Sequence, residues 1–454
     1  MISREPGMKT AAVLDLQQAI DGQAFNKYHL RVLSLCALSV LMDGFDAQAM
    51  GFVAPTLSAE WNIPRGALGP ILTAGLVGML CGALVFGPLA DRFGRRTILL
   101  FCTVWFGVFS LLTASATSVR SMEVLRLITG FGLGGTLPNA IALTSEYMPR
   151  RVRSTCVMLM FTGFSIGAAT GGLVASILIK TFGWRAVFVV GGAAPSLLAA
   201  LLLALPESIR FLVLRGGRTA QVKAYLRKVA PELDVPEDVR FDIPERKERG
   251  FLLDQLFRDG RAVTTLLLWV IFFMSLLDLY FLNSWLPTVL HDSGRQLETA
   301  LRITVMFQVG GAIGAFVLGR TFDRMKSFSG LAAAYAGAAA CVFFIGMAGS
   351  SLIVQTGLVF VTGVCVVGGQ IGSNALAAEL YPTSIRSTGV GWALGIGRIG
   401  SIVGPMLGAI LLSSHLEVRQ VFWVAAVPPG IAVIAAMLVN RRAMNFTSYK
   451  TINQ

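Results

Sequence analysis

Asp43 and Asp46 are the two residues whose type and spacing most directly suggest chemistry. They lie near the middle of an apolar run over residues 30–53. An acidic side chain at the centre of a bilayer costs roughly 2.5–3.5 kcal/mol, so a retained pair needs a reason. The i, i+3 spacing places both carboxyls on one helix face, where desolvation and mutual repulsion favour the protonated form. We predict that the pair carries protons; the alternative is a packing or salt-bridge role, with Arg126 or Arg398 as partner.

Arg398 and Arg126 also fall inside apolar runs. Arg398 lies midway along its run, and the glycines around it let a ligand or a neighbouring helix approach the backbone. A guanidinium stays charged and offers two parallel hydrogen bonds to a carboxylate. We predict that Arg398 binds the carboxylate of a substrate; a permanent ion pair with an acid of the first half is the alternative. Arg126 either neighbours Asp43 and Asp46 on a proton path or extends to the membrane surface.

Aromatic and amide side chains accompany Arg398 on the later runs. Aromatic faces can stack on a ring, and amides can hydrogen-bond a phenolic hydroxyl. For any one of them, packing or a place in the interfacial belt is the commoner role. With Arg398, the predicted substrate-binding residues are Tyr280, Asn283, Gln308, Asn374 and Trp392. The sequence leaves open whether Asp278 serves a ligand, a proton or an internal salt bridge.

The composition places these residues in a membrane protein. Of 454 residues, 54% are hydrophobic and 14% are charged, whereas soluble proteins carry about 25% charged residues. This excludes a soluble enzyme and a secreted disulfide scaffold. Roughly 20 apolar residues cross a bilayer. Twelve runs qualify: 30–53, 68–90, 97–117, 121–145, 155–179, 185–205, 262–289, 300–320, 328–348, 351–378, 385–412 and 418–440.

The distribution of charge predicts the topology. With a cytoplasmic N-terminus, 29 of the 38 basic residues face the cytoplasm and seven face outward, which favours cytoplasmic placement of both termini. The net charge of +13 therefore needs no nucleic-acid partner. The six cysteines form no CxxC pair, so we expect neither a metal site nor a disulfide framework. The predicted segments are a tail (1–29), a six-helix bundle (30–205), a central loop (206–261), a second bundle (262–440) and a tail (441–454).

Two pairs of loops show that the second half repeats the first. Asp91 and Arg92 follow the second run as a pair, and the same Asp-Arg pair recurs 232 residues later at Asp323. A Glu-x-x-Pro motif followed by Arg-Ser-Thr recurs at an offset of 233 residues. Duplicated six-helix bundles are a plan of secondary transporters, with the substrate site near the midplane between the halves. We therefore predict an all-α membrane protein of twelve transmembrane helices in two pseudo-symmetric six-helix bundles.

The charged residues at the predicted cytoplasmic helix ends suggest a gate. Asp91 is expected to cap the N-terminus of the eleventh helix near Ser384 when the protein faces outward, because that terminus is positive. An ordinary topology loop is the alternative. The second Asp-Arg loop lacks the glycine and paired arginines of the first, which weakens its gating role. The predicted gating residues are Asp91, Arg92, Arg95, Glu146, Arg153, Asp323, Glu379 and Arg386.

The sequence also resembles a known family. Residues 87–96 read GPLADRFGRR, which resembles the signature of the major facilitator superfamily. Residues 43–46 (DGFD), 284–288 (SWLPT) and 395–398 (GIGR) are similar to the aromatic acid:proton symporter family, especially its 4-hydroxybenzoate and protocatechuate permeases.

The resemblance implies a proton-coupled importer of a small aromatic carboxylate. It further implies the major facilitator fold, protons as the coupling ion, no cofactor, and a place in the lipid bilayer of a bacterial-type inner membrane. We expect a monomer to be functional, but the sequence itself says nothing about the oligomeric state. Benzoate, gentisate, 3-hydroxyphenylpropionate or a chlorophenoxyacetate are alternative substrates. A non-transporting sensor or a channel is the alternative of a different class. A membrane enzyme is disfavoured, because the sequence shows no nucleophile-base constellation and no HExxH motif.

Overall fold

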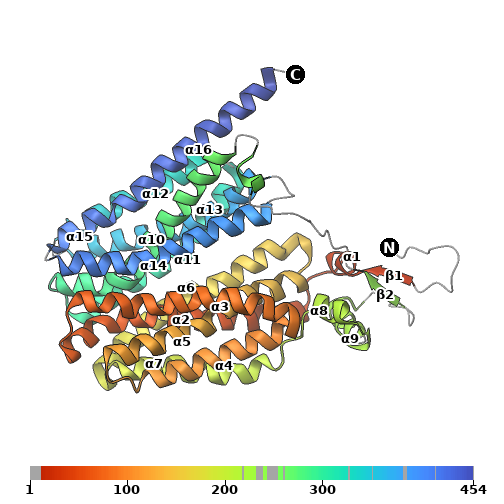
Figure 1. Ribbon diagram of the computed structural model, residues 1–454, viewed down its shortest axis with the longest axis horizontal. Coiled ribbons are helices and arrows are strands. Elements are labelled where there is room, and N and C mark those ends of the chain that lie inside the picture. Colours follow the sequence, from red (N-terminus) through yellow and green to blue (C-terminus); the bar gives the residue numbers. More distant parts are fainter. Residues whose placement is uncertain are drawn as a thin grey trace.

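The structure, a computed structural model, describes residues 12–216, 219–231, 239–242, 254–258, 261–325, 328–349, 351–381, 386–414 and 416–452. It is predominantly helical, with two helical bundles (Figure 1). The N-terminal bundle comprises α2 (Lys27–Trp61), α3 (Leu68–Phe93), α4 (Arg95–Thr113), α5 (Val119–Tyr147), α6 (Arg150–Phe182) and α7 (Arg185–Leu202). The C-terminal bundle comprises α10 (Ala262–Asp292), α11 (Leu297–Met325), α12 (Phe328–Ile345), α13 (Leu352–Leu380), α14 (Arg386–Ser413), α15 (Val418–Ala425) and α16 (Val427–Ile452).

The twelve predicted apolar runs coincide with these helices. Within the described residues, eleven segments are long and apolar enough to cross a membrane, and α15 with α16 counts as one of them. The eleven do not include α2, which is 35 residues long and carries Asp43 and Asp46. The last run is divided at Ala426, and Pro428 and Pro429 lie in the first turn of α16; proline has no amide hydrogen to give to the preceding turn.

The packing of helices repeats between the two bundles, which confirms the predicted fold class. In the N-terminal bundle α2 packs on α6 and α3 packs on α5. The corresponding pairs in the C-terminal bundle are α10 with α14 and α11 with α13. Asp91 and Asp323, the residues that revealed the repeat, lie in the last turns of α3 and α11.

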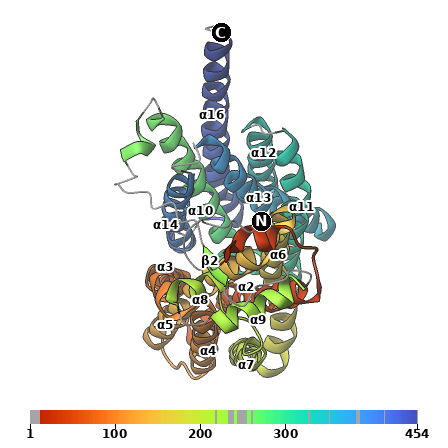
Figure 2. The same ribbon diagram turned by 90° about the vertical axis from the view of Figure 1, so that its right-hand side faces the viewer.

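Short elements gather at one end of the molecule, which we call the inner end. They are β1 (Ala12–Asp15), α1 (Leu16–Asp21), α8 (Ile209–Arg215), α9 (Thr219–Val229) and β2 (Val239–Asp242) (Figure 2). Strands β1 and β2 pair in parallel, a small sheet that the sequence did not predict. Two further turns of 3-10 helix, η1 (Arg65–Ala67) and η2 (Asp254–Leu256), complete the elements. Apolar side chains of α9 bury against α2, so the central segment is attached to the N-terminal bundle.

The two bundles meet at the opposite, outer end. Arg65 forms an ion pair with Asp292 at 2.6 Å, and Lys180 forms one with Glu298 at 3.4 Å. Both pairs join the N-terminal to the C-terminal bundle at their outer helix ends. Toward the inner end the ribbons of the bundles diverge (Figure 1). The described arrangement is therefore closed at the outer end.

Glycines of α14 allow it to pack closely on α10. A Cβ atom at Gly400 would lie 2.2 Å from the carbonyl oxygen of Phe273, and one at Gly404 would lie 2.4 Å from that of Leu277. The glycines near Arg398 were expected to admit either a ligand or a neighbouring helix. Gly400 admits the neighbouring helix α10.

Gly400→Ala is expected to destabilise the protein, because a backbone carbonyl cannot move aside cheaply. Overpacking of this kind costs roughly 1–3 kcal/mol. Gly395→Ala is the matched control, since a Cβ atom at Gly395 meets nothing within 4 Å. Thermal unfolding in detergent measures both variants. Equal unfolding midpoints for the two variants would show that the helices are not in the close contact described here.

Candidate functional site

A cavity of about 320 Å³ lies between the two bundles and contains the principal predicted charges. Its wall includes Asp43 from α2 and Arg398 from α14. Ligand pockets in proteins range from about 300 to 1,000 Å³, so the volume suits a small molecule. Val157 and Met158, close to the inner end of α6, also line it. The cavity therefore extends from the middle of the helices toward the inner end.

Most of the cavity wall is apolar, with a few polar groups. The aromatic lining residues include Phe161, Phe164 and Phe316. Tyr280, Gln370 and Asn374 supply hydroxyl and amide groups. A pocket with an apolar wall and few polar groups binds a ligand by its ring and orients it by its polar substituents.

Asp43 is fully buried at the wall of the cavity. Neither carboxyl oxygen has a hydrogen-bond partner in the described part of the chain. The charge of Arg398 and that of Asp46 both act on it electrostatically. Its position is fixed because α2 lies close against α6: a Cβ atom at Gly44 would lie 2.1 Å from the carbonyl oxygen of Phe164. Asp43 is thus a carboxyl group without a hydrogen-bond partner in the described structure, and it shares the cavity wall with the cation Arg398.

Asp46 has a different environment from Asp43. Its Oδ2 atom accepts a hydrogen bond from Arg126 at 3.1 Å, and its Oδ1 atom accepts one from the Ser110 hydroxyl at 2.8 Å. Asp46 is 2% exposed and Arg126 is 4% exposed. The i, i+3 spacing places the two carboxyls on one side of α2, but Asp46 has two bonded partners whereas Asp43 has none in the described part of the chain.

Arg126 is held within the N-terminal bundle. Its Nη2 atom donates to the Thr113 and Thr129 hydroxyls, each at 3.3 Å. Its guanidinium also lies over the ring of Phe188, 4.8 Å from the centroid. Arg126 therefore lies beside Asp46 and does not extend to the membrane surface.

Arg398 has no carboxylate partner among the described residues. Its Nη1 atom donates to the Tyr280 hydroxyl at 3.4 Å. Since the side chain lines the cavity and is only half-buried, its remaining donors are accessible to a ligand. The arrangement does not show the permanent ion pair that was the alternative role for Arg398.

The other predicted substrate-binding residues divide into two groups. Tyr280 and Asn374 line the cavity. Asn283 and Gln308 are buried and bonded to each other, with Gln308 Nε2 donating to Asn283 Oδ1 at 2.8 Å, and they do not belong to the cavity wall. Sequence reasoning missed Gln370, although its i, i+4 spacing from Asn374 could have indicated a shared helix face.

Trp392 does not belong to the cavity wall. This side chain is 43% exposed and stacks on Trp269, with ring centroids 6.0 Å apart. It is six positions from Arg398, which on a helix is a rotation of about 240°, so it points away from the cavity. The two stacked tryptophans lie near the N-terminal ends of α10 and α14, with Trp392 exposed on the surface of the C-terminal bundle.

Substitution of Trp392 is therefore expected to leave transport unchanged. Trp392→Leu should keep the substrate KM within about twofold of the original, since nothing in the cavity is altered. Tyr280→Phe removes the hydroxyl that Arg398 bonds, and a neutral hydrogen bond contributes about 0.5–1.5 kcal/mol, so its KM should rise about two- to tenfold. Initial uptake rates over a range of substrate concentrations measure both. A larger effect of Trp392→Leu than of Tyr280→Phe would contradict this assignment.

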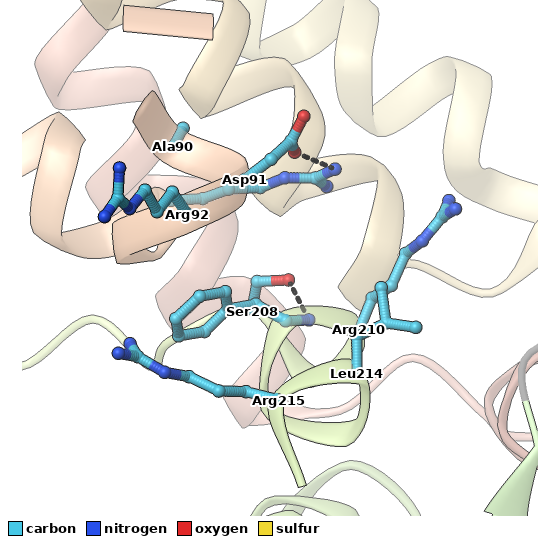
Figure 3. A pocket seen from close by; sticks show the side chains of 9 residues that line it. Ala90, Asp91, Arg92, Ser208, Arg210, Leu214 and Arg215 are labelled. Atoms are coloured by element: carbon cyan, nitrogen blue, oxygen red, sulfur yellow. Dashed lines mark hydrogen bonds and ion pairs between the residues drawn. The ribbon is translucent and has the colours of Figure 1, made fainter. Parts of the chain in front are cut away.

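Three of the predicted gating residues, Asp91, Arg92 and Arg95, line a surface pocket of about 480 Å³ at the inner end (Figure 3). Asp91 is 76% exposed at its side chain and forms an ion pair with Arg95 at 3.7 Å. Arg95 also bonds Glu146, which in turn accepts a hydrogen bond from Ser208 at 2.5 Å. Arg92 lies over the ring of Phe93. In this arrangement Asp91 faces solvent, and Ser384, near its expected partner helix, lies outside the described residues.

The remaining gating predictions are placed as follows. Arg153 forms an ion pair with Asp21 at 3.0 Å, whereas Glu146 bonds Arg95. Asp323 and Glu379 lie in α11 and α13, and Arg386 begins α14; their side chains are outside the described residues.

Sequence reasoning also missed Glu207. Its carboxyl accepts hydrogen bonds from the backbone N–H of Arg96 at 3.0 Å and from that of Thr97 at 3.4 Å. It thereby caps the N-terminus of α4, where a negative charge is favourable.

Comparison with known proteins adds to this geometry. The chain matches the family model of the Major Facilitator Superfamily over residues 36–360 and 268–446. It is 42% identical to the 4-hydroxybenzoate transporter PcaK of Pseudomonas putida, over 94% of this chain and 95% of that protein. It is 41% identical to the gallate transporter of Pseudomonas putida, over 95% and 96% of the two chains.

A solved structure has a similar fold. It is that of a bacterial homologue of the human lysosomal transporter Spinster, with a TM-score of 0.71 and 17% identity, covering 92% of this chain and 98% of the other.

Proposed function

This chain belongs to the major facilitator superfamily and, within it, to the aromatic acid transporters, and we propose that it imports a small aromatic carboxylate together with protons. The 4-hydroxybenzoate and protocatechuate class is the proposed substrate. The observation that carries the proposal is the pairing of Arg398 with Asp43 across an aromatic-lined cavity. We propose a transport role and no catalytic one.

The proposed binding mode follows from the chemistry of the wall. The guanidinium of Arg398 binds the carboxylate of the substrate, because it is a cation without an acidic partner among the described residues. The ring of the substrate packs on the phenylalanines of the wall. The amides of Gln370 and Asn374 bind a ring hydroxyl, and both have a buried carbonyl oxygen without a partner in the described structure.

Competition for Arg398 provides a coupling mechanism. In the cavity, the positive charge of Arg398 acts on the Asp43 carboxyl. When a substrate carboxylate bonds Arg398, that charge is neutralised, and a buried carboxyl without a cation favours its protonated form. Binding of the anion therefore promotes binding of a proton at Asp43. Release of either one to the cytoplasm promotes release of the other.

The proposed orientation places the inner end in the cytoplasm. The predicted cytoplasmic segments hold most of the basic residues. With this orientation both termini are cytoplasmic, and the cavity extends toward the cytoplasm, so the described arrangement faces inward. We place the chain, as a monomer, in the inner membrane of a bacterium.

Uptake of labelled 4-hydroxybenzoate into vesicles that contain the purified protein tests the proposal. Acidifying the exterior should drive accumulation, and a protonophore should abolish it. Competition by a panel of ring acids then ranks benzoate, gentisate, 3-hydroxyphenylpropionate and chlorophenoxyacetate against it. A sensor would show no uptake, and a channel would equilibrate the acid without concentrating it.

A further inference from the structure

Asp278 is a buried acid that the transport mechanism above does not use. It lies near the middle of α10 and is 1% exposed. Neither of its carboxyl oxygens has a hydrogen-bond partner within the described residues. An ionised carboxylate in such a place, without a cation or a hydrogen bond, is strongly disfavoured. Asp278 is therefore uncharged in this arrangement, which means that it holds a proton.

The charges of the membrane core, away from the helix ends, lead to the same conclusion. The described part of this core holds three carboxyl groups, those of Asp43, Asp46 and Asp278, and two guanidinium groups. Arg126 bonds Asp46, and Arg398 faces Asp43 across the cavity. Asp278 is left without a cation, so the core is electrically neutral only when one carboxyl is protonated.

The groups around Asp278 supply no counter-charge. Tyr335 of α12 is the titratable group that interacts with it. On the helices packed against α10, the charged residues with described side chains other than Asp43, Asp46 and Arg398 lie at helix ends: Lys27, Arg31 and Glu60 on α2, Glu298 and Arg302 on α11, Arg419 on α15, and Arg441 and Arg442 on α16. On α10 itself, His291 and Asp292 lie at the outer end.

Tyr335 acts on Asp278 electrostatically, and its hydroxyl is bonded to the helix that supplies two amides to the cavity wall. The Tyr335 hydroxyl, which interacts with Asp278, lies 2.9 Å from the Ser373 hydroxyl. Ser373 is on the same helix as Gln370 and Asn374, and both of these line the cavity with a buried carbonyl oxygen that has no partner in the described structure. No hydrogen bond joins Asp278 to these groups in the described structure, so exchange of its proton with the cavity requires water or a side-chain movement between them.

We propose that Asp278 binds a second coupling proton in the C-terminal bundle, in addition to the one at Asp43. The proposal rests on the transport function given above. The carboxylate takes this proton from water when the cavity faces outward, and the inward-facing arrangement described here still holds the proton, before its release to the cytoplasm. Asp46, which would be the second acid by sequence spacing, is instead held in its ion pair with Arg126.

The stoichiometry of transport distinguishes this proposal from coupling by Asp43 alone. Two protons with a monovalent acid move one net positive charge, so a membrane potential of 100 mV, negative inside, supports about 50-fold accumulation without a pH gradient. One proton with the same acid moves no net charge. Asp278→Asn keeps the shape of the side chain and removes the proton site.

The experiment uses vesicles with an imposed potassium diffusion potential and labelled 4-hydroxybenzoate. The unchanged protein is expected to show a proton-to-substrate ratio of two from its reversal potential. Asp278→Asn is expected to show a ratio of one, keeping uptake driven by a pH gradient and losing the response to potential. A ratio of one for the unchanged protein, or of two for Asp278→Asn, would overturn the proposal. Complete absence of uptake by the unchanged protein would instead refute the transport function.

Substrate counterflow shows whether Asp278→Asn is folded. If it is not, a second measurement on the unchanged protein tests the proposal. Dicyclohexylcarbodiimide modifies protonated carboxyl groups in apolar surroundings, and peptide mapping by mass spectrometry locates the modification in the unchanged protein. Labelling of Asp278 at neutral pH is expected. Failure to label Asp278 would overturn the proposal.

Discussion

Replacing Arg398 by glutamine is expected to lower the affinity for an aromatic carboxylate by about 30-fold or more. Arg398 is the cavity cation without an acidic partner in the described structure. Removing one member of a buried, hydrogen-bonded charge pair costs about 2–5 kcal/mol, which is roughly a 30- to 5,000-fold change in binding constant. Binding of 4-hydroxybenzoate to the purified protein, measured by calorimetry, gives the difference directly.

Two controls separate the loss of charge from general damage to the site. Arg398→Lys keeps the charge but loses the planar pair of donors, so its affinity should fall between those of the original protein and of Arg398→Gln. The neutral amide of the same acid has no carboxylate, and its weak binding should be the same in all three proteins. If Arg398→Gln bound the acid within threefold of the original protein, Arg398 would not be the carboxylate-binding group.

Asp43→Asn is expected to lower accumulation of the substrate against a gradient while preserving exchange, because only the proton proposed for Asp278 then remains coupled. The substitution keeps the shape of the side chain and removes its proton site at the cavity wall. Counterflow requires the two bundles to rearrange with bound substrate but needs no net movement of protons. Accumulation under an acid-outside gradient should fall at least tenfold, whereas counterflow should stay within about threefold. Equal loss of both activities would indicate a structural role for Asp43.

Asp46→Asn serves as the comparison, because the ion pair of Asp46 with Arg126 leads to a different expected result. Removal of this carboxylate leaves the buried guanidinium of Arg126 without its ion-pair partner. Breaking a buried ion pair in this way costs about 3–5 kcal/mol, so the variant should unfold at a lower temperature and lose both activities together. Adding Arg126→Gln to Asp46→Asn should restore part of the stability, since no unpaired charge then remains.

Asp43 and Asp46 illustrate what the sequence could predict about the site and what it could not. Their spacing placed them correctly on one helix, and their cost in a bilayer indicated a function. The sequence could not show that Ser110 and Arg126 bond one of them while the other faces a cavity. Those partners come from helices that are remote along the chain. The position of Trp392 differs from the expected one for a related reason. Its residue type suited an aromatic ligand, but its angular position on α14 exposes it on the surface instead of the cavity wall.

What the sequence determined by itself was the set of helices and their twofold repeat. Long apolar runs must be helical in lipid, because no water is present to satisfy a free backbone, and this holds whatever the neighbours are. The tertiary structure alone decided the surroundings of the buried charges: Arg398 and Asp43 line one cavity, Asp46 bonds Arg126, and Asp278 has no partner in the described structure. Such surroundings depend on helix rotation and on close crossings such as that at Gly400. Both are set by contacts between segments far apart in sequence, which no local pattern records.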